Sequence, residues 1–172
     1  MTAPVMTPDR EQIVEQPYAP THFSEVVETI LETAAEMVRA HVPAFKGAGQ
    51  LGAMIQRPDF AGPFRCALAI ELAKLIGADN PDVSTVFSYD LAEPNLHLIA
   101  LVSRPTHGHS AYIRALDQAL CERMRELRVP DCNGHTGMLD VQFVTPKDVR
   151  LGIGVTGLLS AVRTAPVRIW TR

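Results

Sequence analysis

Two loops in the second half of the sequence carry side chains that bind transition metals. The first loop holds His107 and His109, and the second holds Cys132 and His135. Imidazole and thiolate are zinc ligands, and Cys-x-x-His is an acceptable half-site. The loops flank a predicted helix of about eighteen residues, whose 1.5 Å rise per residue separates them by roughly 27 Å. We therefore expect no four-ligand site within one chain, whereas a site shared between two subunits stays open.

A glycine pattern, Gly47-x-Gly49-x-x-Gly52, has the spacing that binds the pyrophosphate of a dinucleotide. That motif needs a buried strand before it and a helix of several turns after it, because the helix N-terminus holds the phosphates. Here Pro43 interrupts the preceding residues, and Pro58 ends the following run after five residues. We interpret the glycines as part of a connector in which close backbone packing or bending matters, and we expect no bound cofactor.

Four further side chains have the types used in acid–base or nucleophilic chemistry: Ser88, Asp90, His97 and Asp140. Such catalysis needs a nucleophile beside an identified base, and no recognisable motif surrounds these residues. Asp90 falls in a polar connection between two predicted strands, where acidic residues are common. His97 interrupts an apolar strand, which is more typical of a hydrogen-bonded core or interface histidine.

The order of elements around these residues resembles the nucleotidyltransferase fold in its small bacterial form. In that family one strand ends in a Gly-Ser turn, the next carries Asp-x-Asp, and a later strand carries a third carboxylate. The stretches VFSYDLAEPNLHLIALV and LDVQFVTPKDV follow this layout within residues 83–149. Asn95 and His97 occupy the Asp-x-Asp positions, and Asp140 occupies the third acidic position. No Gly-Ser turn precedes them, because Phe87-Ser88-Tyr89 stands there.

The resemblance implies a relative that has lost nucleotidyl transfer. Two divalent cations must bridge the triphosphate in that reaction, and Mg²⁺ prefers clustered carboxylate oxygens. An amide at Asn95 and an imidazole at His97 do not replace two carboxylates in a magnesium site.

These residues are positioned by elements that periodicity and turn signals predict. The run at 96–102 is apolar almost throughout, so we expect a central strand covered on both faces. Thr145, Pro146 and Asp148 have the types and spacing of a helix cap. In chain order we expect a helix within 21–42, a helix over 64–76, strands at 83–89 and 96–102, a helix over 110–127, a strand at 138–144, a weak helix after Thr145 and a short strand at 166–170.

The predicted fold class is α+β, with two N-terminal helices followed by a small mixed sheet in the order ββαβ(α)β covered by helices. Residues 1–20 contain four prolines and are expected to form an extended or disordered arm. Residues 21–172 are expected to form a single domain. Within it, residues 43–63 are expected to be a long Gly/Ala/Pro connector.

Charge and composition exclude several classes of protein. The formal net charge of −3 gives no general attraction to nucleic acid or to an anionic membrane, although residues 1–36 are acidic and residues 141–172 are basic. Three cysteines far apart argue against a disulfide scaffold. The first residues lack the features of a signal peptide, and the longest apolar run, at 151–162, is shorter than the about 20 residues that span a bilayer. We expect a cytoplasmic protein.

We favour a non-catalytic protein that binds other proteins or assembles with itself. The alternative is a divergent nucleotide-binding or nucleotidyltransferase-like enzyme with a site near Ser88, Asp90, His97 and Asp140. The enzyme hypothesis requires His97 and Asp140 to point into one cleft that solvent reaches.

Overall fold

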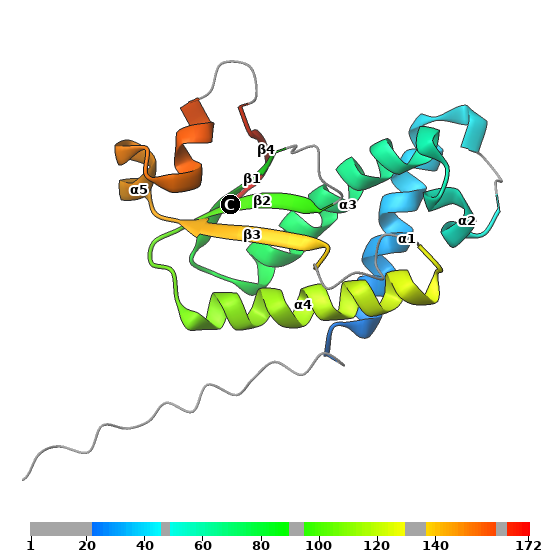
Figure 1. Cartoon of the computed structure of the whole chain (residues 1–172), viewed down its shortest axis with the longest axis horizontal. Coiled ribbons are helices and arrows are strands. Elements are labelled where there is room, and N and C mark those ends of the chain that lie inside the picture. The colour runs from blue at the N-terminus through cyan, green and yellow to red at the C-terminus, as the bar shows by residue number, and fades with distance from the viewer. Residues whose placement is uncertain (1–21, 46–48, 90–94, 130–136, 161–164) are drawn as a thin grey trace, which may run out of the picture.

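The computed structural model describes residues 22–45, 49–89, 95–129, 137–160 and 165–172. One sheet forms, and helices pack against it, so the predicted α+β class is confirmed (Figure 1). In chain order the elements are α1 (Ser24–His41), η2 (Pro43–Phe45), α2 (Leu51–Ile55), α3 (Pro58–Asp79), β1 (Val83–Tyr89), β2 (Leu96–Val102), α4 (His107–Glu126), β3 (Leu139–Val144), α5 (Pro146–Leu151), η4 (Gly154–Ser160) and β4 (Val167–Thr171).

The sheet is mixed and has the strand order β3-β2-β1-β4. β1 runs antiparallel to β2 and to β4, whereas β2 and β3 run parallel. The parallel pair needs a crossover, and this is α4, which packs against β3 (Figure 1). β2 lies inside the sheet and buries six of its seven residues, as its apolar sequence predicts.

The helical layer is built from α1, α3 and α4. α3 packs against β1, β2 and β4, and α1 packs against α3 and α4. α1 buries Val27, Leu31 and Val38 along one side, at the three- and four-residue spacing of an amphipathic helix. At the base of this layer, the buried ring of Phe23 meets Tyr112 of α4 edge to face, with 5.1 Å between the ring centroids.

α3 is longer than the sequence indicates, and this corrects the connector expected over 43–63. That segment contains η2 and α2, and α3 begins at Pro58 rather than at Phe64. A proline in the first helical turn loses no hydrogen bond, so Pro58 starts the helix. Pro63 does remove one interior bond. The helix continues through it because Phe60 and Phe64 are both almost fully buried, with their rings stacked 5.6 Å apart.

The last strand is fixed to the end of α3 by two contacts. Gly77 lies directly against the indole of Trp170, where a Cβ atom has no room. The guanidinium of Arg172 donates to the carbonyl oxygens of Gly77, Asn80 and Val83. A cation at this position also complements the negative end of the helix dipole. β4 is therefore held to α3 by side chains in addition to its ladder with β1.

The cap predicted after β3 is present. Thr145 is the N-cap of α5, and its hydroxyl accepts from the Asp148 N–H, while the Asp148 carboxylate accepts from the Thr145 N–H and hydroxyl. These hydrogen bonds hold the pKa of Asp148 below its usual range, and the bond from the Thr145 hydroxyl has the largest effect. Gly152 ends the helix in the left-handed region, with φ of 61°.

Candidate functional site

His97 and Asp140 lie side by side on the parallel strands β2 and β3. They are direct partners in the register, and the His97 Nδ1 and Asp140 Oδ2 atoms are 3.3 Å apart. The other carboxylate oxygen of Asp140 accepts from Gln142 Nε2 at 2.7 Å. Tyr89, the partner of His97 on β1, places its ring 5.3 Å from the imidazole. Two of the predicted candidate residues are thus brought together on one face of the sheet.

Burial limits what this pair does chemically. The His97 side chain is 5% exposed and the Asp140 side chain is 41% exposed. The Nε2 atom of His97 is buried as well. Solvent therefore reaches the carboxylate far more readily than the imidazole. The geometry suits a hydrogen-bonded histidine that ties β2 to β3.

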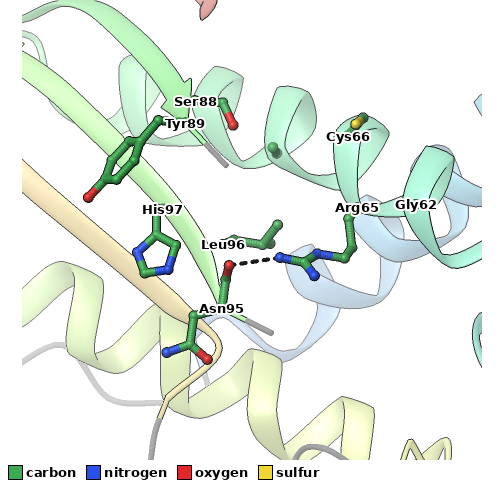
Figure 2. Close-up of a pocket in the computed structure, with 9 residues that line it drawn as sticks. Gly62, Arg65, Cys66, Ser88, Tyr89, Asn95, Leu96 and His97 are labelled. Atoms are coloured by element: carbon green, nitrogen blue, oxygen red, sulfur yellow. Dashed lines mark hydrogen bonds between the residues drawn. The ribbon is translucent and has the colours of Figure 1, made fainter. Parts of the chain in front are cut away.

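A cavity of about 260 Å³ lies between the first half of α3, the end of β1 and the start of β2, and Tyr89 and His97 contribute to its lining. Arg65 crosses it, and its Nη2 atom donates to the carbonyl oxygen of Asn95 at 2.9 Å (Figure 2). Figure 2 shows the Ser88 hydroxyl on the side of β1 that faces α3. The rings of Tyr89 and His97 lie on the other side of the strands (Figure 2).

Ser88 and His97 therefore belong to opposite faces of the sheet. This follows from the register, in which Ser88 pairs with Leu98 and Tyr89 pairs with His97, because neighbouring residues of a strand point to opposite faces. A hydroxyl and an imidazole so placed do not form a nucleophile–base pair. Asp90, the fourth candidate, lies outside the described residues.

His109, a predicted candidate metal ligand, has a structural role. It is the third residue of α4 and completes a capping box, in which the Thr106 N–H donates to His109 Nδ1 at 3.0 Å. Its Nε2 atom lies 3.1 Å from Asp82 Oδ1, and its ring stacks on Phe143 at 4.6 Å. His107, the first residue of the helix, is exposed. Cys132 and His135 lie outside the described residues.

Among the residues that the structure describes, no group of three or more His, Cys, Asp or Glu side chains is placed to hold a metal ion. The candidate His107 therefore has no second and third ligand near it in this part of the chain. His109 has both ring nitrogens engaged, one in the helix cap and one with Asp82.

The glycine motif is explained by packing. η2 rather than a strand occupies 43–45, and the helix that contains Gly52, α2, has five residues. Gly52 lies against the carbonyl of Leu127 at the end of α4, with no space for a Cβ atom, whereas Gly49 faces open space. Gly52 therefore lies where only a residue without a side chain fits. Gly47 lies outside the described residues.

The sequence analysis missed Asp117 and Arg65. Asp117 Oδ1 accepts from the backbone N–H groups of Met138 at 2.8 Å and Leu139 at 2.9 Å, and thereby fixes the start of β3 to α4. Arg65 lies on α3 directly after the buried Phe64. The only sequence signal for either residue is a charged side chain beside the apolar stripe of a helix.

β3 forms one edge of the sheet, and no described strand pairs with its outer side. Every second residue of a parallel strand turns its N–H and C=O toward the neighbour. The Leu96 N–H donates to the Met138 carbonyl, so Asp140 and Gln142 face β2, whereas Val141 and Phe143 turn their backbone groups outward. Among the described residues, nothing bonds to these outward groups.

The two edges of the sheet differ in their protection. Charged side chains, proline and bulges are the usual devices that keep an edge strand from pairing. β4 follows Pro166 and carries Arg168, and Arg172 comes directly after it. β3, with the sequence LDVQFV, carries one charged residue, Asp140, and has no proline, no basic residue and no shift in its register with β2.

Comparison of the chain with protein-family models, with curated proteins and with solved structures gives no match. None of the described helices combines the length and apolar character needed to cross a membrane. What the chain does must then be inferred from its own residues.

Proposed function

We propose that this chain is a non-catalytic protein-interaction or assembly protein, which pairs the outer edge of β3 with an extended segment of another chain. The observation that carries this proposal is the edge of β3 described above, which is uninterrupted and lacks proline, basic residues and a bulge. Strand addition to an exposed edge is a common mode of peptide recognition.

The side chains of β3 indicate what the added segment contains. Asp140 and Gln142 lie on the face opposite the helices, whereas Val141 and Phe143 lie half-buried on the helical side. A paired strand places its residues beside them in the same alternation. The partner segment is thus expected to alternate apolar residues with polar or basic ones, a basic residue being favoured beside the Asp140 carboxylate.

The energy of such pairing comes from both backbone and side chains. Each backbone hydrogen bond contributes about 0.5–1.5 kcal/mol net, so the four outward groups of Val141 and Phe143 supply only a few kcal/mol. Apolar burial against these two side chains adds roughly 25 cal/mol per Å². Specificity then depends on the side chains, because any strand can provide the backbone bonds.

The absence of a catalytic arrangement in the described residues supports the same proposal. Ser88 and His97 lie on opposite faces of the sheet, and the imidazole of His97 is buried. Asp140 uses both carboxylate oxygens within the sheet, and His109 caps a helix.

The test compares Val141→Pro with Val141→Thr in the full chain expressed in its native cells. Proline removes only the outward N–H, because the N–H of residue 141 is not in the ladder with β2. Threonine keeps the N–H and the β-branched shape. We expect the wild type and Val141→Thr to co-purify with a partner or to self-associate in sedimentation, and Val141→Pro to lose this association.

Retention of the partner by a folded Val141→Pro variant would contradict the proposal. Should that variant unfold, Gln142→Lys provides the second test, since Gln142 is exposed and a lysine on an edge opposes strand pairing. Its control is Gln118→Lys, at an exposed position of α4.

A second function is favoured by one specific observation. His97 and Asp140 stand at two of the acidic positions of the nucleotidyltransferase pattern, and their side chains are 3.3 Å apart. A nucleotide-binding protein or divergent enzyme with a site near these residues would use that pair. Magnesium–ATP should then shift the imidazole resonances of His97 in NMR spectra, and Asp140→Asn should weaken the effect. Unchanged His97 resonances in saturating nucleotide would exclude this alternative.

A further inference from the structure

Two cavities share one wall at Arg65. The first, of about 260 Å³, has polar residues around it, including Ser88 and Asn95. The second, of about 160 Å³, lies deeper, between α3, the end of α4 and the starts of β2 and β3. Arg65, Asn95 and Leu96 line both, so the two spaces adjoin at these residues.

Most of the residues that line the deeper cavity are apolar. Among its lining residues, Phe64 and Leu68 are 1% exposed, Met124 is 3% exposed, and Ile55 and Val129 are 8% exposed. Protein interiors are close-packed and contain few voids larger than a water molecule. An apolar cavity of roughly 150 Å³ stays dry and accommodates a molecule the size of benzene. The space therefore suits a six-membered ring or a short branched chain.

Arg65 supplies the charge at the junction. Its guanidinium donates to the Asn95 carbonyl at 2.9 Å, which holds the side chain at the wall that the two cavities share. A guanidinium has five N–H donors in a planar fork, and this fork matches the two oxygens of a carboxylate. A ligand with a carboxylate at one end and an apolar body at the other would satisfy both parts of the space.

We propose that this double cavity binds a small organic acid, whose carboxylate lies at Arg65 and whose compact apolar body fills the space beside Phe64, Leu68 and Met124. The proposal does not depend on strand pairing at β3. The ligand site and the edge share no backbone group, so the two proposals fail separately.

The test uses benzoate as the charged probe and toluene as a neutral probe with the same ring. Binding is measured on the full chain by NMR titration. We expect both probes to perturb the resonances of Leu68 and Met124. Arg65→Gln should lower the affinity for benzoate by roughly tenfold or more, as expected for loss of a charge-assisted contact. The same substitution should change the affinity for toluene by no more than about twofold.

Two further variants complete the test. Ala61→Leu adds carbon atoms to the wall of the deeper cavity and should abolish binding of both probes. Arg57→Gln is the matched control, because Arg57 pairs with the exposed Asp59 and lines neither cavity. It should bind both probes as the wild type does.

Three results would overturn the proposal. One is no benzoate binding to the wild type at about 10 mM, the weakest affinity that a specific site of this size should show. Another is an equal loss of benzoate affinity in Arg65→Gln and Arg57→Gln. If Arg65→Gln fails to fold, toluene binding that persists in Ala61→Leu would contradict the assignment of the apolar cavity.

Discussion

The two edges of the sheet are built in opposite ways. β4 is fixed from the side by the Trp170 indole on Gly77 and by the Arg172 guanidinium on the end of α3, and basic residues line it. β3 pairs with β2, and side chains hold it at its start, through Asp117, and at Phe143, through the ring of His109. No described residue bonds to the outward backbone groups of Val141 and Phe143. The edge at β4 is held by side chains, and the edge at β3 is the one that we propose pairs with another chain.

The largest effect on stability is expected at the anchor of β3. Asp117→Ala removes an acceptor from the N–H groups of Met138 and Leu139, and hydrogen bonds to a charged group contribute about 1.5–3 kcal/mol. We expect the free energy of unfolding to fall by about 3 kcal/mol. Asp117→Asn keeps an oxygen in place and should recover most of it in urea titrations. Equal losses in both variants would show that the oxygen is not the anchor.

A smaller effect is expected at the anchor of β4. Gly77→Ala places a Cβ against the Trp170 ring and should destabilise the chain by about 1–3 kcal/mol. Gly62→Ala, in the same helix but facing open space, should stabilise it by up to about 1 kcal/mol. The opposite signs, measured by urea unfolding, distinguish steric contact from helix propensity. An increase in stability on Gly77→Ala would contradict the close contact between Gly77 and the Trp170 indole.

The smallest effect concerns the cap that follows β3. The pKa of Asp148 is lowered in the folded state, chiefly by the Thr145 hydroxyl. Its contribution is therefore present above the unfolded pKa, about 3.9, and is lost as the pH falls through the lower folded value. The gap in thermal stability between wild type and Asp148→Asn should be present at neutral pH and shrink below about pH 4. A gap independent of pH would contradict the role of the carboxylate.

Local pattern was enough to predict the strands, α1, α4 and the Thr145 cap, because each depends on residues a few positions apart. The start of α3 was missed because burial of Phe60 and Phe64 outweighs the loss of one bond at Pro63. The start of α3 thus depends on tertiary packing, which local sequence periodicity does not reveal.

The candidate site was predicted less well than the fold. The meeting of His97 and Asp140 depends on the parallel register of β2 and β3, which local spacing does not determine. The place of Arg65 between two cavities depends on how α3 crosses the sheet. Ser88 and His97 were predicted to share a site because both lie within one family pattern. In the structure they lie on opposite faces of the sheet, because neighbouring strand residues alternate between faces.

The most direct test of the open edge is crosslinking from both edges of the sheet. A benzophenone side chain placed at Gln142 on β3, or at Arg168 on β4, is activated by light in the native cell. The account predicts a defined adduct from position 142, its loss when Val141→Pro is added, and no comparable adduct from position 168. No adduct from position 142, or equal adducts from both positions, would contradict it.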